Sequence, residues 1–239
     1  MLALTKVDQL ISFIDNQLNR NDKSSTKSAL LRIDSICTYP IKSCAAIIMD
    51  KTNDSFPFTR QGLKYDRAWM VMNAKTKDKL TQRKCPKLAL IQPILTDTHL
   101  LVTVGNKQCN ISLSSKQRDC GDEVAKMISE FIGIECRLIK NESTVQAWDS
   151  HPLLIVFKES IQCLNEKVLN QKNVLKYDYL RFRLNLLLSG LDKPFAEEGI
   201  KHCTVFTHCL QIVFLIEMHC LHHSILPLHE MFSDIIMFR

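Results

Sequence analysis

The sequence lacks the patterns that are typical of secreted, membrane-anchored and nucleic-acid-binding proteins. Residues 1–18 carry Lys6, Asp8 and Asp15 and contain no continuous apolar block, so they do not predict a secretory signal. No membrane anchor is visible. Basic and acidic residues are interleaved, without the alternation of aromatic and basic residues seen in nucleic-acid-binding surfaces. We therefore expect a soluble, cytoplasmic protein with no nucleic-acid or membrane partner.

The chain also lacks internal repeats, low-complexity tracts and the paired Cys-x-x-Cys spacing of many metal sites. Its ten cysteines are scattered through apolar segments, where a cysteine usually acts as a small buried hydrophobic residue. We expect reduced thiols, as in a cytosolic protein. They lie at positions 37, 44, 85, 109, 120, 136, 163, 203, 209 and 220.

The chain does contain enough apolar material for a core. Its 239 residues, 46% of them hydrophobic, suit one large or two small globular domains. The 31 basic and 25 acidic residues give a formal net charge of +6. This mild excess of positive charge favours anionic ligands in a general way.

Strands dominate the predicted structure of residues 31–113. Residues 31–39 alternate as a strand does, and Pro40 ends that strand because proline has no N–H to donate. Residues 68–72 are apolar enough for a buried strand, and residues 88–91 are a further apolar run in this β-rich region. Strands this short and closely spaced favour a closed barrel over a doubly wound sheet.

Turns and helices complete the expected structure. Residues 73–79 predict an exposed hairpin tip rich in lysine, and residues 100–113 predict a hairpin that turns at Gly105-Asn106. Apolar spacing between 124 and 131 predicts a helix with Asp119 as its N-cap and Gly133 at its end. The other expected elements are an amphipathic helix at 1–18, a polar linker at 19–28, strands at 136–140, 152–157 and 182–188, and a helix at 161–169.

The segment Tyr39-Pro40-Ile41-Lys42-Ser43 predicts a tight corner at a strand end. An ammonium, a hydroxyl and freed backbone N–H groups at such a corner suit a phosphate or another anion. After it, the apolar run 45–49 is expected to return into the core. Arg67 lies beside Lys42 only if the segment around Asp66 and Arg67 pairs with this one. The alternative is a solvated Lys42 and an Arg67 that only forms a salt bridge with Asp66.

Several ordered segments together carry a resemblance to a known family. They are YPIKSCAA at 39–46, GLKYDRAWMV at 62–71, LTQRKCPKLALIQP at 80–93, RDCG at 118–121, SHPLLI at 150–155, and RFRLN at 181–185 running to Ser189-Gly190. With these segments the chain resembles the MOSC family, the C-terminal domain of molybdenum cofactor sulfurases. The mitochondrial amidoxime-reducing component is a related protein, and the doubled Ala45-Ala46 looks more like the sulfurase branch.

The resemblance implies a fold that is mainly β with α (α+β), a MOSC-type β-barrel with flanking helices. It also implies a division of the chain. Residues 1–28 are a helix and linker, 29–115 the N-terminal β-barrel part, 116–198 a partial MOSC domain and 199–239 an unmatched tail rich in Cys and His. The C-terminal part is therefore expected to be incomplete.

The resemblance also implies a ligand, the molybdenum cofactor (molybdopterin). This pterin carries a terminal phosphate and a dithiolene that holds molybdenum, so its site needs cations for the phosphate and hydrogen-bond donors for the pterin. Basic, neutral polar and loop positions of the family pattern fall on seven residues of this sequence. The candidate cofactor-binding residues are Lys42, Ser43, Arg67, Arg183, Asn185, Ser150 and His151.

Family members serve sulfuration of the cofactor for molybdoenzymes, a sulfurtransferase activity. Their sulfur-donating domain binds pyridoxal phosphate, and neither that domain nor the late cysteine that ligates molybdenum is seen here. We assign no catalytic residue, and whether the chain is an enzyme stays open. Its expected partners are the cofactor, a pyridoxal-phosphate sulfurase domain and a molybdoenzyme acceptor. The alternatives are a free-standing molybdenum-dependent reductase of N-hydroxylated substrates and a truncated, non-catalytic remnant.

The composition changes after Gly199. Six of the eight histidines and three of the ten cysteines lie within residues 201–229. Zinc ligation is one interpretation, but structural zinc sites usually have tighter, paired ligands, so chance clustering is the other. Residues 203–221 are interrupted by polar side chains and do not predict a membrane span. A truncated or alternatively read C-terminus is our hypothesis for this tail.

Overall fold

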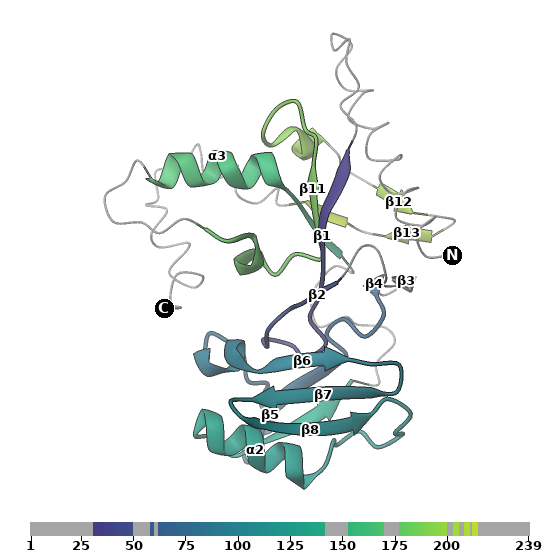
Figure 1. The fold of residues 1–239 in the computed structure, drawn as a ribbon, viewed down its shortest axis with the longest axis vertical. Helices are drawn as coiled ribbons and strands as arrows, with labels where there is room; N and C mark the ends of the chain where they lie inside the picture. The colour runs from purple at the N-terminus through teal and green to yellow at the C-terminus, as the bar shows by residue number, and fades with distance from the viewer. Residues whose placement is uncertain are drawn as a thin grey trace. The chain divides into compact units, whose positions relative to one another are not determined.

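The computed structural model describes residues 31–49, 58–59, 62–141, 153–169, 177–199, 203–205, 208–210 and 212–214 (Figure 1). The described residues form two compact units. Unit 2 holds residues 38–47 and 65–141, and unit 1 holds the remaining described residues. The helix predicted at 1–18 and the linker predicted at 19–28 lie outside the described residues.

The secondary structure is mixed α+β and mainly β, as the sequence predicts. Unit 2 contains one antiparallel pair, one antiparallel three-stranded sheet and a single described α-helix beside them (Figure 1). Helix α2 packs against strands β7, β8 and β9. The elements are β5 (Trp69–Asn73) paired with β9 (Cys136–Lys140), the sheet of β6 (Gln92–Leu95), β7 (His99–Val104) and β8 (Lys107–Ser112), and α2 (Asp122–Ile132).

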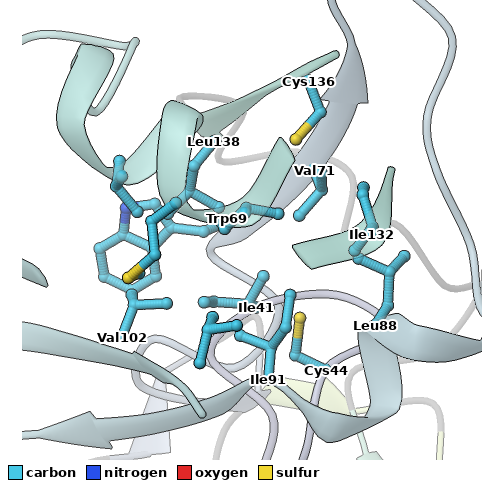
Figure 2. Packing of buried hydrophobic residues seen from close by; sticks show 14 of the residues in the cluster. Ile41, Cys44, Trp69, Val71, Leu88, Ile91, Val102, Ile132, Cys136 and Leu138 are labelled. Atoms are coloured by element: carbon cyan, nitrogen blue, oxygen red, sulfur yellow. The ribbon is translucent and has the colours of Figure 1, made fainter. Parts of the chain in front are cut away.

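Unit 2 has one hydrophobic core, to which the strands, the helix and a loop all contribute (Figure 2). Trp69 and Val71 enter it from β5 and Leu138 enters it from β9. Ile41 precedes β5 in the chain and Ile91 directly precedes β6, and all five side chains are fully buried. The buried strand predicted at 68–72 is confirmed.

Unit 1 contains a five-stranded sheet with the order β14-β10-β11-β1-β2. Strand β11 pairs antiparallel with β1 and parallel with β10, while helix α3 packs against β10 and β11. The elements are β1 (Arg32–Thr38), β2 (Ile47–Met49), β10 (Leu153–Phe157), α3 (Lys158–Leu169), β11 (Leu186–Ser189) and β14 (Ile212–Phe214). Shorter pieces of unit 1 are β3 (Phe58–Thr59), β4 (Gly62–Leu63), β12 (Cys203–Val205), β13 (His208–Leu210) and two 3₁₀ helices, η2 (Tyr179–Phe182) and η3 (Ala196–Gly199). Another 3₁₀ helix, η1 (Pro86–Leu90), belongs to unit 2.

Most of the elements expected from the sequence are present in the described residues. The strands expected at 31–39, 136–140 and 152–157 are β1, β9 and β10, and the helix expected at 161–169 lies within α3. The hairpin of β7 and β8 turns at Gly105-Asn106, as predicted. Gly133 ends α2 in the left-handed conformation that glycine tolerates, with φ of 78°.

Three expectations about local structure are wrong. The apolar run 88–91 is not a strand, because Pro86 begins a 3₁₀ helix that includes Leu88 and Leu90. The run 45–49 does not return into the core: β2 is the last strand of its sheet and Ile48 is 54% exposed. The strand expected from 182 begins only at Leu186.

The predicted N-cap of α2 is also wrong. Gly121 occupies the cap position and makes no side-chain cap. The Asp119 carboxylate instead accepts a hydrogen bond from the Gly121 N–H at 3.0 Å and two from the Arg137 guanidinium, at 2.7 and 2.8 Å. Asp119 therefore ties the loop before α2 to strand β9.

The segment after Gly199 is partly described. Its strand β14 pairs parallel with β10, with Ile212 opposite Leu153. No group of three metal-ligating side chains gathers among the described residues, and the side chains of residues 201–229 lie outside that description. The zinc interpretation therefore stays untested. Among the described helices, none has the length and apolar character needed to cross a membrane.

Candidate functional site

The predicted corner lies at the end of β1, and it pairs with the segment that leads into β5. The Arg67 N–H donates to the Tyr39 carbonyl at 2.8 Å, and the Trp69 N–H donates to the Pro40 carbonyl at 2.9 Å. The Lys42 N–H donates back to the Trp69 carbonyl at 2.7 Å. Ile41 and Trp69 form a parallel bridge. The condition that the two segments pair is met, so residues far apart in sequence share one corner.

The backbone turns sharply directly after Lys42. Ser43 has a φ of 68° and is only 7% exposed, and the Cys44 N–H closes the turn by donating to the Ile41 carbonyl at 3.1 Å. A positive φ is uncommon for residues other than glycine, and it often marks a functional or strained position. Ser43 is therefore held, largely buried, within the corner.

Asp66 organises the other half of the corner. Its Oδ1 accepts the Tyr39 N–H at 2.7 Å and the Thr38 hydroxyl at 3.3 Å. Its Oδ2 pairs with Nη1 of Arg67, whose guanidinium lies 5.4 Å from the centroid of the Tyr39 ring. The Arg67 and Asp66 side chains are 12% and 4% exposed. The salt bridge in the alternative interpretation therefore exists, and it also fixes the position of the guanidinium.

The thiol of Cys120 lies near the side chain of Trp69, which follows the corner in the chain. Burial, and next the charge of Asp119, raise the pKa of Cys120 to about 11. A thiol with this pKa stays protonated near neutral pH in the metal-free protein, so it is a poor nucleophile there. This fits the interpretation of Cys120 as a packing residue.

One residue of the corner was missed by the sequence reasoning. Lys79, next to the hairpin tip after β5, has a pKa below its ordinary value because of desolvation and the nearby positive charge of Lys42. The only sequence signal was the lysine-rich hairpin predicted at 73–79. Nothing in that pattern distinguishes Lys79 from Lys75 or Lys77, because only the register of the hairpin decides which lysine approaches Lys42.

Two more predicted residues belong to unit 1, in the turn before β11. Arg183 follows η2 with a φ of 54°, and its N–H donates to the Leu180 carbonyl at 3.0 Å. The Asp178 carboxylate starts this turn by accepting the Leu180 N–H at 3.0 Å. The left-handed conformation of Arg183 explains why the strand starts after it and not at Phe182.

Asn185 links three strands of the unit 1 sheet. Its Oδ1 accepts the Leu154 N–H at 3.0 Å, and its Nδ2 donates to the Cys37 carbonyl at 3.3 Å. Its backbone N–H and C=O bind the same two residues, both at 2.8 Å. Asn185 is 1% exposed, so its side chain serves the joining of β1, β10 and β11. Its predicted bond to a cofactor stays a prediction.

The seven candidate residues thus fall into three sets. Unit 2 brings together Lys42, Ser43 and Arg67, and unit 1 brings together Arg183 and Asn185. Ser150 and His151 lie outside the described residues.

Comparison with known proteins identifies similar sequences. Residues 30–135 match the family model described as MOSC N-terminal beta barrel domain. A molybdenum cofactor sulfurase of Drosophila mojavensis is 30% identical over an alignment of 224 residues, and the match covers 82% of this chain and 28% of that protein. The protein of the same name from Danio rerio is 28% identical over an alignment of 221 residues, and the match covers 73% of this chain and 26% of that protein.

These curated relatives are much longer than this chain, which spans less than a third of their length. A third relative of the same name, from Drosophila willistoni, is also 30% identical. The match covers 77% of this chain and 26% of that relative, again less than a third of its length. The chain carries a MOSC N-terminal beta barrel domain over residues 30–135 and is related over most of its length to the molybdenum cofactor sulfurases.

Proposed function

We propose that this chain binds the molybdenum cofactor (molybdopterin), and that Lys42, Ser43 and Arg67 contact the anionic part of the cofactor. The observation that carries this proposal is the parallel pairing of Tyr39–Lys42 with Arg67–Trp69. The pairing places an ammonium-bearing residue and a guanidinium-bearing residue at one corner, although 24 residues separate them in sequence. When bound, the cofactor supplies molybdenum chemistry; the protein residues bind and orient it.

The side chains present at the corner fit an anionic group. Lys42 and Lys79 are close enough for the charge of Lys42 to lower the pKa of Lys79, so an anion placed there relieves a repulsion that exists without it. The Arg67 guanidinium has a planar set of donors that suits phosphate oxygens. Because Asp66 and the Tyr39 ring hold it, binding loses less side-chain freedom than it does for a mobile arginine.

The remaining candidates have distinct roles in this proposal. Arg183 and Asn185 of unit 1 stay in the proposal as cofactor-binding residues, Arg183 as a cation and Asn185 through one neutral hydrogen bond besides those that it makes between strands. Ser150 and His151, which precede β10 in sequence, supply polar contacts in this proposal. The left-handed turn at Arg183 supports its part, since it presents the residue outside the regular sheet.

The wider role follows from the relatives and is part of the proposal. In it, the chain holds the cofactor while sulfur is transferred for use by molybdoenzymes in the cytoplasm. The sulfur is supplied by a pyridoxal-phosphate domain that belongs to the same longer protein or to a partner. The identical names of relatives from fly and fish support this role.

The proposal is tested by measuring cofactor retention in purified protein. Molybdenum is quantified by elemental analysis, and the pterin is released, oxidised and measured by fluorescence. We expect Lys42→Ala with Arg67→Ala to abolish both signals, because it removes the two cations that the corner unites. The matched control is Lys107→Ala with Lys126→Ala, which removes two exposed lysines from β8 and α2 of the same unit. Equal retention in the two double variants would refute the site.

A further inference from the structure

Lys42 and Lys79 lie along the same edge of strand β5. On that edge, the Trp69 carbonyl accepts the Lys42 N–H at 2.7 Å, and the Val71 carbonyl accepts the Leu80 N–H at 2.9 Å. Alternate residues of a strand direct their backbone groups to the same edge, so the segments around Lys42 and Leu80 follow one another along it. The Met72–Lys79 bridge fixes the register of the second segment.

The two lysines also belong to the same face. Ile41 and Leu80 are buried in the core of unit 2 together with Trp69 and Val71. Because side chains alternate along an extended chain, the residues next to Ile41 and Leu80 lie on the face away from that core. Lys42 follows Ile41 and Lys79 precedes Leu80. Lys42 is half-buried and Lys79 is exposed.

The charge of Lys42 acts on the ammonium group of Lys79. Desolvation and the charge of Lys42 lower the pKa of Lys79, so the surroundings disfavour its protonated form. Arg137 shares this face, since it lies opposite Met72 in β9. Its guanidinium pairs with two carboxylates, Asp119 and Asp122, at 2.7 and 2.6 Å. These two acids are therefore engaged by Arg137.

We propose that Lys79 is a second phosphate-binding lysine, which acts with Lys42 on a dianionic phosphate monoester. The inference rests on the proposed function in taking the phosphate of molybdopterin as that monoester, and it adds a binding residue that no sequence motif marks. A phosphate monoester carries between one and two negative charges at neutral pH, which two neighbouring ammonium groups match. Binding it converts the repulsion between the lysines into two attractive contacts.

The first experiment compares cofactor dissociation from Lys79→Met, Lys79→Arg and Lys75→Met proteins. We expect about tenfold faster loss from Lys79→Met, as for one lost charged hydrogen bond. Lys79→Arg keeps the charge and should retain the cofactor. Lys75 is the matched control, because it is exposed on the same hairpin and pairs with Glu135 at 3.3 Å. If the wild type holds the cofactor and Lys79→Met holds it equally well, the inference is wrong.

The second experiment follows the titration of the Lys79 amine by NMR in cofactor-free protein with isotope-labelled lysine. Lys42→Met removes a cause of the lowered pKa, so the pKa should rise towards its ordinary value. Inorganic phosphate should raise the pKa in the wild type and much less in Lys42→Met. A wild type that responds to phosphate but never retains cofactor would refute the proposed function and leave the lysine pair standing. No response to phosphate would overturn the pair itself.

Discussion

The corner of unit 2 and the turn before β11 in unit 1 use their polar residues in different ways. In unit 2, Asp66 accepts from the backbone and from Arg67, so one carboxylate both holds the corner and fixes a cation. In unit 1, the Asn185 side chain is directed to the backbone of two other strands. The two regions therefore differ in what the hydrogen bonds of their polar side chains do. In unit 2 they also position a charged group, whereas in unit 1 they join strands.

The largest effect is expected from Asn185→Ala. This change leaves the partly buried Leu154 N–H and the buried Cys37 C=O without their side-chain partner, at a cost of about 3 kcal/mol in unfolding free energy. Urea unfolding followed by circular dichroism measures it. Asn110→Ala, at an exposed position of β8, is the control and should change little. A stable Asn185→Ala protein that no longer holds cofactor would reverse our comparison, because Asn185 would then serve mainly the ligand.

A smaller effect on stability is expected from Asp66→Asn. The amide oxygen still accepts from Tyr39, but the charge that holds Arg67 is lost, so we expect a loss of about 2 kcal/mol in the same unfolding measurement. Cofactor retention should fall as well, since the guanidinium is no longer fixed. Asp97→Asn removes an exposed carboxylate from the same unit and is the control. Unchanged retention in Asp66→Asn would show that Arg67 does not need Asp66 to be positioned.

The smallest effect on stability is expected for Arg137. This cation is ion-paired with carboxylates, in contrast to the two lysines, which repel each other. Hydrogen bonds from Arg137 chiefly lower the pKa of Asp119 below its ordinary 3.8. A carboxyl group with a lowered folded-state pKa stabilises the fold above its ordinary pKa, and this contribution disappears as the pH falls through the folded value. The destabilisation caused by Arg137→Met should therefore be present near pH 6 and shrink below about pH 4. Unfolding midpoints measured across that range test it. A pH-independent effect would mean that Arg137 acts through packing alone.

The sequence could predict much of the secondary structure because local signals decided it. The alternation of β1, the turn at Gly105, the helical spacing of α2 and its end at Gly133 each depend on residues near in sequence. One error arose because a residue distant in sequence intervened. Asp119 had the local features of an N-cap, but Arg137, 18 residues away, engages its carboxylate.

The candidate site, too, depends partly on features visible in the sequence and partly on contacts that only the folded chain makes. The sequence by itself determined that Lys42, Ser43 and Arg67 stand in motifs that suit an anion, since residue types and their order are visible there. Only the tertiary structure decided that the two segments pair, that Asp66 fixes Arg67, that Asn185 links strands, and that Lys79 lies near Lys42. Strand register carries this information, because a shift by one residue would turn Lys79 to the opposite face.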